Sequence, residues 1–379
     1  MTVDTRGRRA AQAVVKAAER LGPAPELGGI RRRIRRRATI RAGLAGLALI
    51  LTAAVLWPRL TPPGQPESIR PEPVLSGVPG LDRRVRDAIP TGQTTRTDLA
   101  VGPDAVWVLN RNRLPGQDML VRVDPATDRV VARIPVGRNA IRVAVGEGSV
   151  WVLRSSPERA EVVEVDPARN LVVGARQVWA TSDPDGSLAE QLVVAGGSVW
   201  FVAQPGLVRY DLRSNAAHTV LAASRYSPLN GLAAAGDSIW VGAAGSVVRV
   251  RLSDAAVLAP INLAALGVIP IDGLATAGEK LWVLGYGQAV NVDPDTGRVV
   301  ASVELRSGRS ADVQPGLVAA DSTVVAARGR ASLYLLDPAA NRAQAPVPLP
   351  GTGALGVGAG AVWVTDDAQG RLLRVDPQP

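Results

Sequence analysis

The chain offers few side chains that carry out chemistry, and those it has lie far apart. Among its 379 residues there is one histidine, His218, and no cysteine. A histidine cluster, a thiolate metal site and a disulfide are therefore excluded. The phosphate-binding pattern GxxxxGK followed by Ser or Thr is also absent. We predict no catalytic residue, no metal site and no cofactor, and carboxylate pairs among the loop Asp and Glu residues stay open as an alternative.

The most regular of the ionisable groups are aspartates that precede proline. An Asp side chain accepts hydrogen bonds from nearby backbone N–H groups, and proline fixes φ, so this pair is typical of tight turns. We interpret five such residues as turn formers and not as catalytic acids: Asp124, Asp166, Asp293, Asp337 and Asp376.

These turns belong to a unit that recurs along the chain. Its most recognisable part is a turn followed by a tryptophan, as in GEGSVWV at residues 146–152. Tryptophan takes this position at 107, 151, 200, 240, 282 and 363, and a weaker copy, ADSTVVA at 320–326, aligns with Val324 in the same position. The spacings are 44, 49, 40, 42, 42 and 39 residues. A period near forty residues is typical of a repeat architecture.

Each unit is predicted to contain four short strands. In the first unit these are residues 96–102, 105–110, 120–125 and 129–137, where valine alternates with polar residues. One such sheet cannot bury both of its faces, whereas seven sheets around an axis can, with the tryptophans packed between neighbours. The sequence therefore predicts an all-β, seven-bladed β-propeller.

The two ends of the repeat region predict how the ring closes. The last unit stops after its third strand, at residues 371–376. The missing fourth strand has a counterpart at the start of the region, because RRVRDAIPTGQ (83–93) resembles RVVARIPVGRN (129–139). We expect residues 83–90 to pair beside residues 371–376, which removes an open sheet edge.

The units VDPATDRVVARIPVG, VDPDTGRVVASVEL and AVGEGSVWV resemble those of the YVTN-type bacterial β-propellers, over about residues 83–379. The resemblance implies a seven-bladed ring from a surface or exported protein. It implies little about function, because the motif residues are structural. The segments ahead of the ring resemble those of membrane-anchored actinobacterial propellers, some of which are associated with sigma-factor systems.

Streptogramin lyase-like enzymes share this general fold. The more distant resemblance to them implies a histidine and acidic groups around a divalent metal. Only His218 could fill the histidine's role in this chain. We expect it on an outer strand, away from the axis of the ring, which argues against such a centre.

The segment before the ring differs from it in composition. Residues 1–41 contain 12 Arg and Lys against 3 Asp and Glu, a net charge of +9, so the rest of the chain is neutral. A neutral ring gives no reason to expect nucleic-acid binding. We divide the chain into a basic cytoplasmic tail with a short helix (1–37), an apolar segment (38–57), a proline-rich linker (58–80) and the propeller (81–379).

The apolar segment predicts a single transmembrane helix, because about twenty residues in a helix span the hydrocarbon core of a bilayer. The arginine cluster before it places the N-terminus in the cytoplasm, so the cell membrane separates the tail from an extracytoplasmic propeller. A cleaved signal peptide and a buried core helix are the alternatives. The tail carries an apolar stripe formed by Val14, Val15, Ala18 and Leu21. Both a cytoplasmic partner of this stripe and a plain topology signal stay open.

The connections between consecutive units vary in length and fall on one face of the predicted ring, where propellers bind ligands. We expect a protein, peptide or carbohydrate ligand there. The candidate binding residues lie in 179–191, 225–230, 263–272 and 306–316, and they are Trp179, Asp183, Asp185, Glu190, Arg225, Tyr226, Asn230, Asp272, Arg309 and Asp312.

These features predict a membrane-tethered, extracytoplasmic propeller that serves, without catalysis, as a binding, sensing or scaffolding module. Two alternatives stay open. One is a propeller enzyme of the lyase or quinone-dependent dehydrogenase type, which needs polar residues that converge near the axis. The other is a transmembrane regulator whose tail binds a cytoplasmic factor.

Overall fold

A computed structural model describes most of the repeat region. The described residues are 75–76, 80–92, 96–111, 117–156, 159–180, 190–203, 206–222, 229–266, 268, 270–285, 287–305, 313–329, 331–349 and 353–378. The predicted tail and apolar segment lie outside them, as does most of the proline-rich linker. Among the described residues no helix combines the length and the apolar character that a membrane crossing requires.

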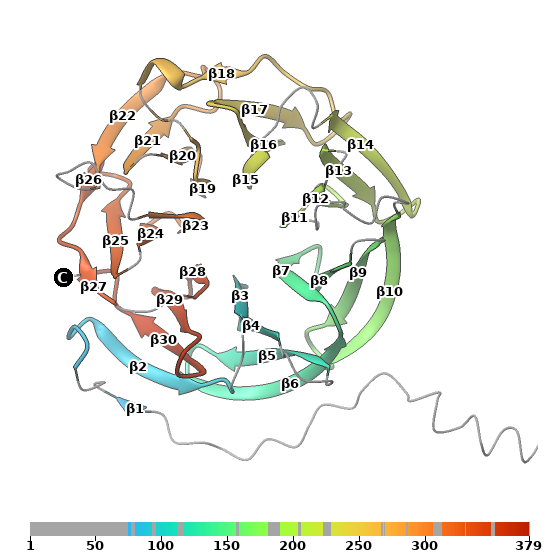
Figure 1. Ribbon diagram of the computed structural model, residues 1–379, viewed down its shortest axis with the longest axis vertical. Helices are drawn as coiled ribbons and strands as arrows, with labels where there is room; N and C mark the ends of the chain where they lie inside the picture. The colour runs from blue at the N-terminus through green and yellow to red at the C-terminus, as the bar shows by residue number, and fades with distance from the viewer. Residues whose placement is uncertain are drawn as a thin grey trace, which may run out of the picture. The chain divides into compact units, whose positions relative to one another are not determined.

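Seven antiparallel sheets surround a central axis, and in six of them the chain runs from an inner strand to an outer one (Figure 1). We number these sheets as blades 1 to 7. Blades 1 to 3 are β3 (Arg96–Val101), β4 (Val106–Arg111), β5 (Asp118–Asp124) and β6 (Arg129–Gly137); β7 (Ala140–Gly146), β8 (Ser149–Ser156), β9 (Arg159–Asp166) and β10 (Leu171–Ala180); and β11 (Glu190–Ala195), β12 (Ser198–Ala203), β13 (Gly206–Asp211) and β14 (Ala216–Ala222).

Blades 4 to 6 follow the same order but have shorter or divided outer strands. They are β15 (Leu229–Ala235), β16 (Ser238–Ala243), β17 (Ser246–Arg251) and β18 (Ile261–Asn262); β19 (Gly273–Ala277), β20 (Lys280–Gly285), β21 (Gln288–Val292) and β22 (Val299–Glu304); and β23 (Val313–Ala320), β24 (Val325–Gly329) and β25 (Ser332–Asp337) with β26 (Arg342–Ala343) and β27 (Val347–Pro348). A 3-10 turn, η2 (Ala264–Leu266), follows β18.

Blade 7 is assembled from both ends of the ring, as predicted. It contains β28 (Leu355–Gly358), β29 (Ala361–Asp366), β30 (Arg371–Val375) and the early strand β2 (Val85–Pro90). The register runs from Val85 opposite Val375 to Pro90 opposite Arg371. A short strand that the sequence did not predict, β1 (Leu75–Ser76), pairs with the outer edge of β2.

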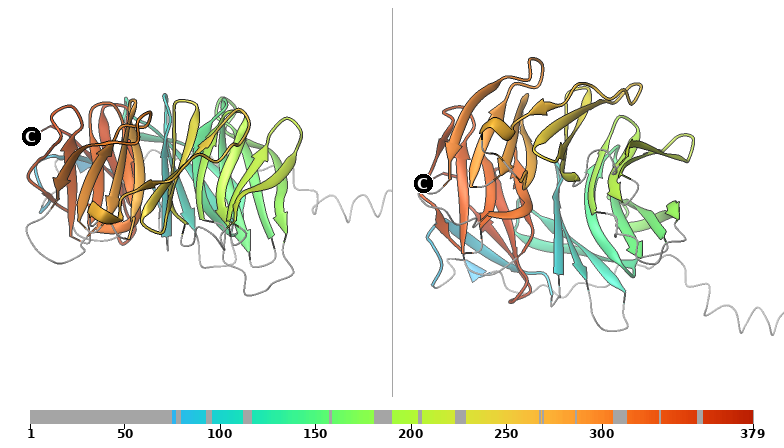
Figure 2. Two further views of the ribbon diagram at one scale, coloured as in Figure 1. Left: turned by 90° about the horizontal axis from the view of Figure 1, so that it is seen from above. Right: turned by 45° about the horizontal axis from the view of Figure 1, so that its top comes forward.

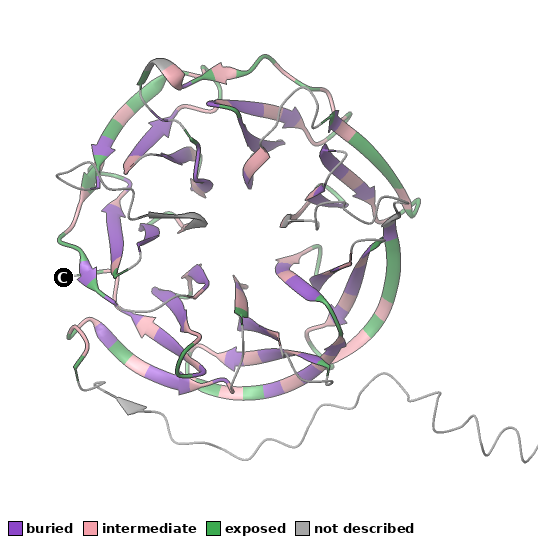
Figure 3. Ribbon diagram, viewed as in Figure 1, coloured by how far each residue is buried: buried purple, intermediate pink, exposed green. Residues whose placement is uncertain are grey.

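Tryptophans on the second strand of six blades form the core between blades. Each is at most 2% exposed, in accordance with the predicted packing role. Trp107 of blade 1, for example, belongs to one buried cluster with Val143, Val150 and Val152 of blade 2. Figure 3 shows the outcome, with burial concentrated on the middle strands and exposure on the outer rim.

The predicted alignment of blade 6 was wrong by two residues. The carbonyl of Val324 closes the turn before the second strand, and Ala105 does the same in blade 1. Ala326 therefore occupies the position of Trp107, two residues later in each case. The turn of blade 6 lacks the glycine of the other copies and no tryptophan follows it, so no residue marked the correct alignment. A shift of two residues keeps the same side-chain face, and both residues are buried.

The Asp-Pro aspartates form turns, as predicted. Asp124 accepts a hydrogen bond from the backbone N–H of Ala126 (2.9 Å), and Asp293 accepts two, from Asp295 and Thr296 (both 2.9 Å). Asp166, Asp337 and Asp376 accept equivalent bonds. These backbone donors lower the pKa of Asp293 and contribute to the lowered pKa of Asp124.

Candidate functional site

The predicted binding residues that have a described backbone, Trp179, Glu190, Asn230 and Asp272, lie toward one face of the ring. Because the four strands of a blade are antiparallel, the hairpin between its second and third strands lies on the same face as the connection to the next blade. We call this the connection face. The Asp-Pro turns join the third and fourth strands and therefore lie on the opposite face. Figure 2 shows the ring edge-on, with loops on both faces.

Most of the predicted binding residues lie outside the part of the chain that the structure describes: Asp183, Asp185, Arg225, Tyr226, Arg309 and Asp312. For Trp179 and Glu190 the backbone alone is described. Trp179 lies near the end of β10, opposite Ala160 of β9, and Glu190 begins β11 opposite Val202. Their roles stay predictions.

Asn230 and Asp272 occupy neighbouring inner strands at the connection face. Asn230 is half-buried on β15, and Asp272 is 8% exposed just before β19. Between them the two strands touch, because a Cβ on Gly231 would lie 2.8 Å from the backbone nitrogen of Leu274. The backbone N–H of Asp272 donates to Leu284 O at 2.7 Å. These two residues are thus brought close, while the other candidates with a described backbone belong to blades 2 and 3.

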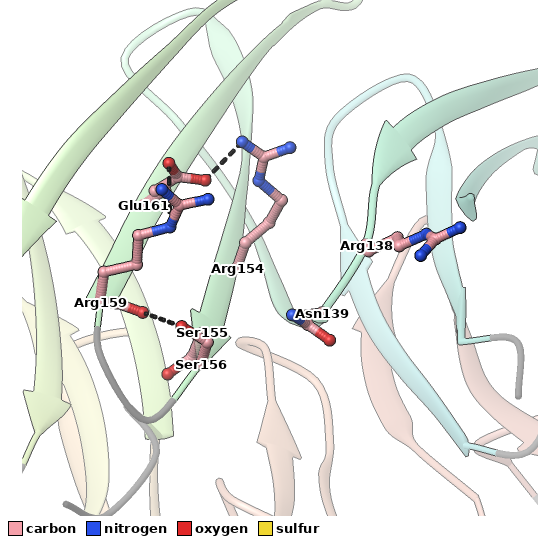
Figure 4. Close-up of a pocket in the computed structure, with 7 residues that line it drawn as sticks. All are labelled: Arg138, Asn139, Arg154, Ser155, Ser156, Arg159 and Glu161. Carbon is pink, nitrogen blue, oxygen red and sulfur yellow. Dashed lines mark hydrogen bonds and ion pairs between the residues drawn. The ribbon is translucent and has the colours of Figure 1, made fainter. Parts of the chain in front are cut away.

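A pocket that the sequence did not predict opens on the connection face beside blades 1 and 2. Its volume is about 520 Å³. Two elements form it, the connection from β6 to β7 and the hairpin between β8 and β9 (Figure 4). The lining residues are Arg138, Asn139, Arg154, Ser155, Ser156, Arg159 and Glu161. In the sequence, Arg154 and Arg159 of the pocket stand close together in RSSPERAE (154–161), the segment that contains the hairpin between β8 and β9.

The connection from β6 to β7 has a backbone that suits glycine and asparagine. Gly137 has φ +86° and Asn139 has φ 61°, the left-handed region that these residues enter most easily. A Cβ on Gly137 would lie only 2.2 Å from Nη1 of Arg154, so the glycine makes room for that guanidinium. The backbone N–H of Ser155 donates to Asn139 O at 2.9 Å, which fixes the hairpin against the connection.

The pocket is electropositive. Arg154 Nη2 donates to Glu161 Oε2 at 2.6 Å, and Arg159 Nε lies 3.6 Å from Glu161 Oε1. Arg138 is exposed and directs its guanidinium away from this pair (Figure 4). Three arginines against one glutamate leave a net charge of 3 − 1 = +2. Such a set of donors binds and orients an anion.

Two half-buried carboxylates hold the inner strand β3 to its neighbours. Asp98 accepts a hydrogen bond from Val143 N at 2.7 Å, across to β7 of blade 2. Asp367, in the hairpin between β29 and β30 of blade 7, accepts a hydrogen bond from Thr97 Oγ1 of β3 at 2.5 Å. Burial raises the pKa of both carboxyls. Because each carboxylate joins two blades, we assign both a role in the packing of the ring.

His218 lies on β14, the outer strand of blade 3, opposite Arg209 and exposed, as predicted. Within the described ranges, no three acidic or histidine side chains come close enough together to bind a metal ion.

No protein-family model matches the chain, and no curated protein matches it either. Solved structures share its fold. A structure of streptogramin B lyase is similar with a TM-score of 0.58 and 12% identity, over 75% of this chain and 94% of that one. PorZ, a surface component of the type-IX secretion system of Porphyromonas gingivalis, has a TM-score of 0.51 and 14% identity, over 76% of this chain but 39% of PorZ. BamB from Moraxella catarrhalis has a TM-score of 0.49 and 11% identity, over 73% and 84%. At these identities the likeness shows the propeller fold alone.

Proposed function

We propose that this protein is a membrane-tethered, extracytoplasmic propeller that acts as a binding, sensing or scaffolding module and not as an enzyme. The observation that carries the proposal is the arginine-rich pocket on the connection face. Its guanidinium, amide and hydroxyl groups bind and orient a ligand, and its one carboxylate, Glu161, is engaged by Arg154. A closed ring of seven blades supplies the rigid frame that such a site needs.

The tether is proposed from the sequence. Residues 38–57 are long and apolar enough for one span, and the arginines before them favour a cytoplasmic N-terminus. The proline-rich linker then holds the ring away from the bilayer. On this proposal the ring meets ligands outside the cytoplasm, and the stripe from Val14 to Leu21 meets any partner inside.

The enzyme alternative draws on the fold that the chain shares with streptogramin B lyase. A lyase-like centre in this chain needs His218 near the axis, yet His218 is exposed on the outer strand of blade 3. The position of the only histidine thus favours the binding module.

The proposal is tested by crosslinked affinity capture from native membranes with three baits: the full chain, the chain without residues 1–30 and the chain without residues 81–379. A partner that is lost only with the ring supports the binding module. A partner that is lost only with the tail favours the transmembrane regulator instead. If no bait captures a specific partner, and purified protein converts a candidate substrate, the enzyme alternative replaces the proposal.

A further inference from the structure

We infer that the pocket beside blades 1 and 2 binds a small hydroxylated carboxylate, the class of the sugar acids. This inference rests on the proposed binding function and names a ligand class for it. The pocket volume of about 520 Å³ falls within the range of about 300–1,000 Å³ typical of small-molecule sites.

Arg154 positions the rest of the pocket. Its guanidinium is engaged on two sides, with Glu161 Oε2 at 2.6 Å and the backbone carbonyl of Val136 at 3.5 Å. It also packs against Gly137, where any side chain would collide with it. Arg154 therefore fixes the orientation of Glu161 and leaves ligand binding to the other two arginines.

Arg159 and Arg138 are the residues that meet the carboxylate. Arg159 is 60% exposed, and its Nε lies 3.6 Å from Glu161 Oε1. We expect its terminal nitrogens to meet the ligand. Arg138 is exposed on the opposite side of the pocket, on a separate element. A guanidinium presents two parallel N–H donors that match the two oxygens of a planar carboxylate. A turn of the Arg138 side chain toward the pocket completes the pair.

Glu161 adds hydrogen-bond acceptors to the arginine donors, because its carboxylate lies among the arginines that line the pocket. Its oxygens accept hydrogen bonds from ligand hydroxyls, and the Asn139 amide and the Ser156 hydroxyl offer further polar contacts. A carboxylate with adjacent hydroxyls uses all of these groups, whereas an acidic peptide side chain uses the arginines alone.

The test is isothermal titration calorimetry on the purified full chain in lipid nanodiscs. The ligands are galacturonate, the neutral sugar galactose, inorganic phosphate and N-acetyl-glutamate amide. The variants are Arg138→Gln and Arg159→Gln. The control is Arg176→Gln on the outer strand β10 of the same blade, where Arg176 pairs with Glu164 at 3.9 Å outside the pocket. Thermal unfolding of each variant checks that the ring is intact.

We expect saturable binding of galacturonate by the wild type and by R176Q, and no binding of galactose. R138Q and R159Q should each lower the affinity for galacturonate about tenfold or more, because each variant loses one charge-assisted contact. Polygalacturonate, tested in the same way, shows whether the ligand is a free sugar acid or the end of a polymer, and either result agrees with the inference.

The inference is overturned if galacturonate does not bind, if R138Q and R159Q bind it as the wild type does, or if phosphate or the glutamate derivative binds more tightly. If it falls while capture by the ring persists, the binding module stands with another ligand. If capture does not depend on residues 81–379, the proposed function falls regardless of the calorimetry.

Discussion

Arg374, on the last strand of the ring, donates to both carboxylate oxygens of Asp128, which lies 246 residues earlier in the turn between β5 and β6 (3.0 and 2.8 Å). The same guanidinium lies 5.4 Å from the ring centroid of Trp363 and donates to Pro125 O at 3.0 Å. Arg374 thus joins blade 7 to blade 1, whereas the pairing of β2 with β30 closes blade 7 itself.

The same arrangement recurs between other blades. Arg122 stacks on Trp107 and donates to Pro167 O at 2.6 Å, in the Asp-Pro turn of the next blade. Arg249 stacks on Trp240 and donates to Pro294 O at 3.1 Å. Blade 6 has Ala326 and Leu335 in place of the tryptophan and the arginine, and both are buried. In blade 6 an apolar pair therefore takes the place of both the arginine and the tryptophan.

Loss of the Arg374 guanidinium should destabilise the closed ring. Arg374→Gln leaves the half-buried carboxylate of Asp128 without its cation and removes the contact with Trp363. We expect the free energy of unfolding to fall by about 3 kcal/mol. Urea unfolding of the full chain, followed by tryptophan fluorescence, measures the change.

Arg371→Gln is the matched control for this prediction. Arg371 lies on the same strand, with similar exposure, and pairs at 2.9 Å with Asp366 inside blade 7. Its loss should cost about 1 kcal/mol, because no blade boundary is involved. Equal losses in the free energy of unfolding would show that the contact between blades contributes no more to stability than the contact within blade 7.

Removal of β30 should abolish cooperative unfolding of the whole ring. Deletion of residues 371–379 leaves β2 and β29 without their shared partner and opens two sheet edges. Deletion of residues 378–379 alone spares the strand and serves as the control. Circular dichroism during heating should show one sharp transition for the control and a broad loss of structure for the longer deletion. A sharp transition in both would contradict the role of closure.

Two equally buried tryptophans should respond differently to replacement by phenylalanine. Trp363 Nε1 donates to Gly358 O at 3.0 Å, whereas Trp240 Nε1 is buried without an acceptor among the described residues. Trp363→Phe removes this hydrogen bond, while Trp240→Phe removes an unsatisfied donor. We expect Trp363→Phe to cost about 1–2 kcal/mol more in the free energy of unfolding. Chemical denaturation of both variants measures the two changes in the free energy of unfolding. A larger loss for Trp240→Phe would contradict this prediction.

The Asp-Pro turns should weaken in acid. Backbone N–H donors lower the pKa of Asp293 below its ordinary value of 3.8, so its charged form stabilises the folded state. That contribution is complete above pH 3.8 and is lost as the pH falls through the lowered value. The stability difference between the wild type and Asp293→Asn should therefore disappear in strong acid. Denaturant titrations across a series of pH values measure it.

For Asp98 we expect stability to depend on pH in the opposite direction. Burial raises the pKa of its carboxyl, so the folded state favours the protonated form. The associated stability is present below pH 3.8 and is lost as the pH rises through the raised value. Relative to Asp98→Asn, the wild type should lose stability as the pH increases. If the stabilities of the two proteins change with pH in the same way, the pKa of Asp98 is not raised in the folded state.

Local sequence determined most of the fold. Alternating valines, the Asp-Pro turns and the tryptophan of each unit act over a few residues, so their recurrence predicts strands, turns and the number of blades. The likeness of residues 83–93 to 129–139 was enough to predict that β2 completes blade 7, because an unpaired third strand needs a partner.

Only the tertiary structure decided which side chains meet across blades. The contact of Arg374 with Asp128 depends on the placement of one blade against the next, and the pocket lined by Arg138 and Arg159 depends on how the connection from β6 to β7 packs against the hairpin of blade 2. A repeat pattern fixes each blade but not the rotation of side chains at a boundary, where residues distant in sequence come together after the ring closes. The predicted binding residues were chosen by loop length, whereas the pocket arises because Gly137 lets the Arg154 guanidinium lie against the backbone.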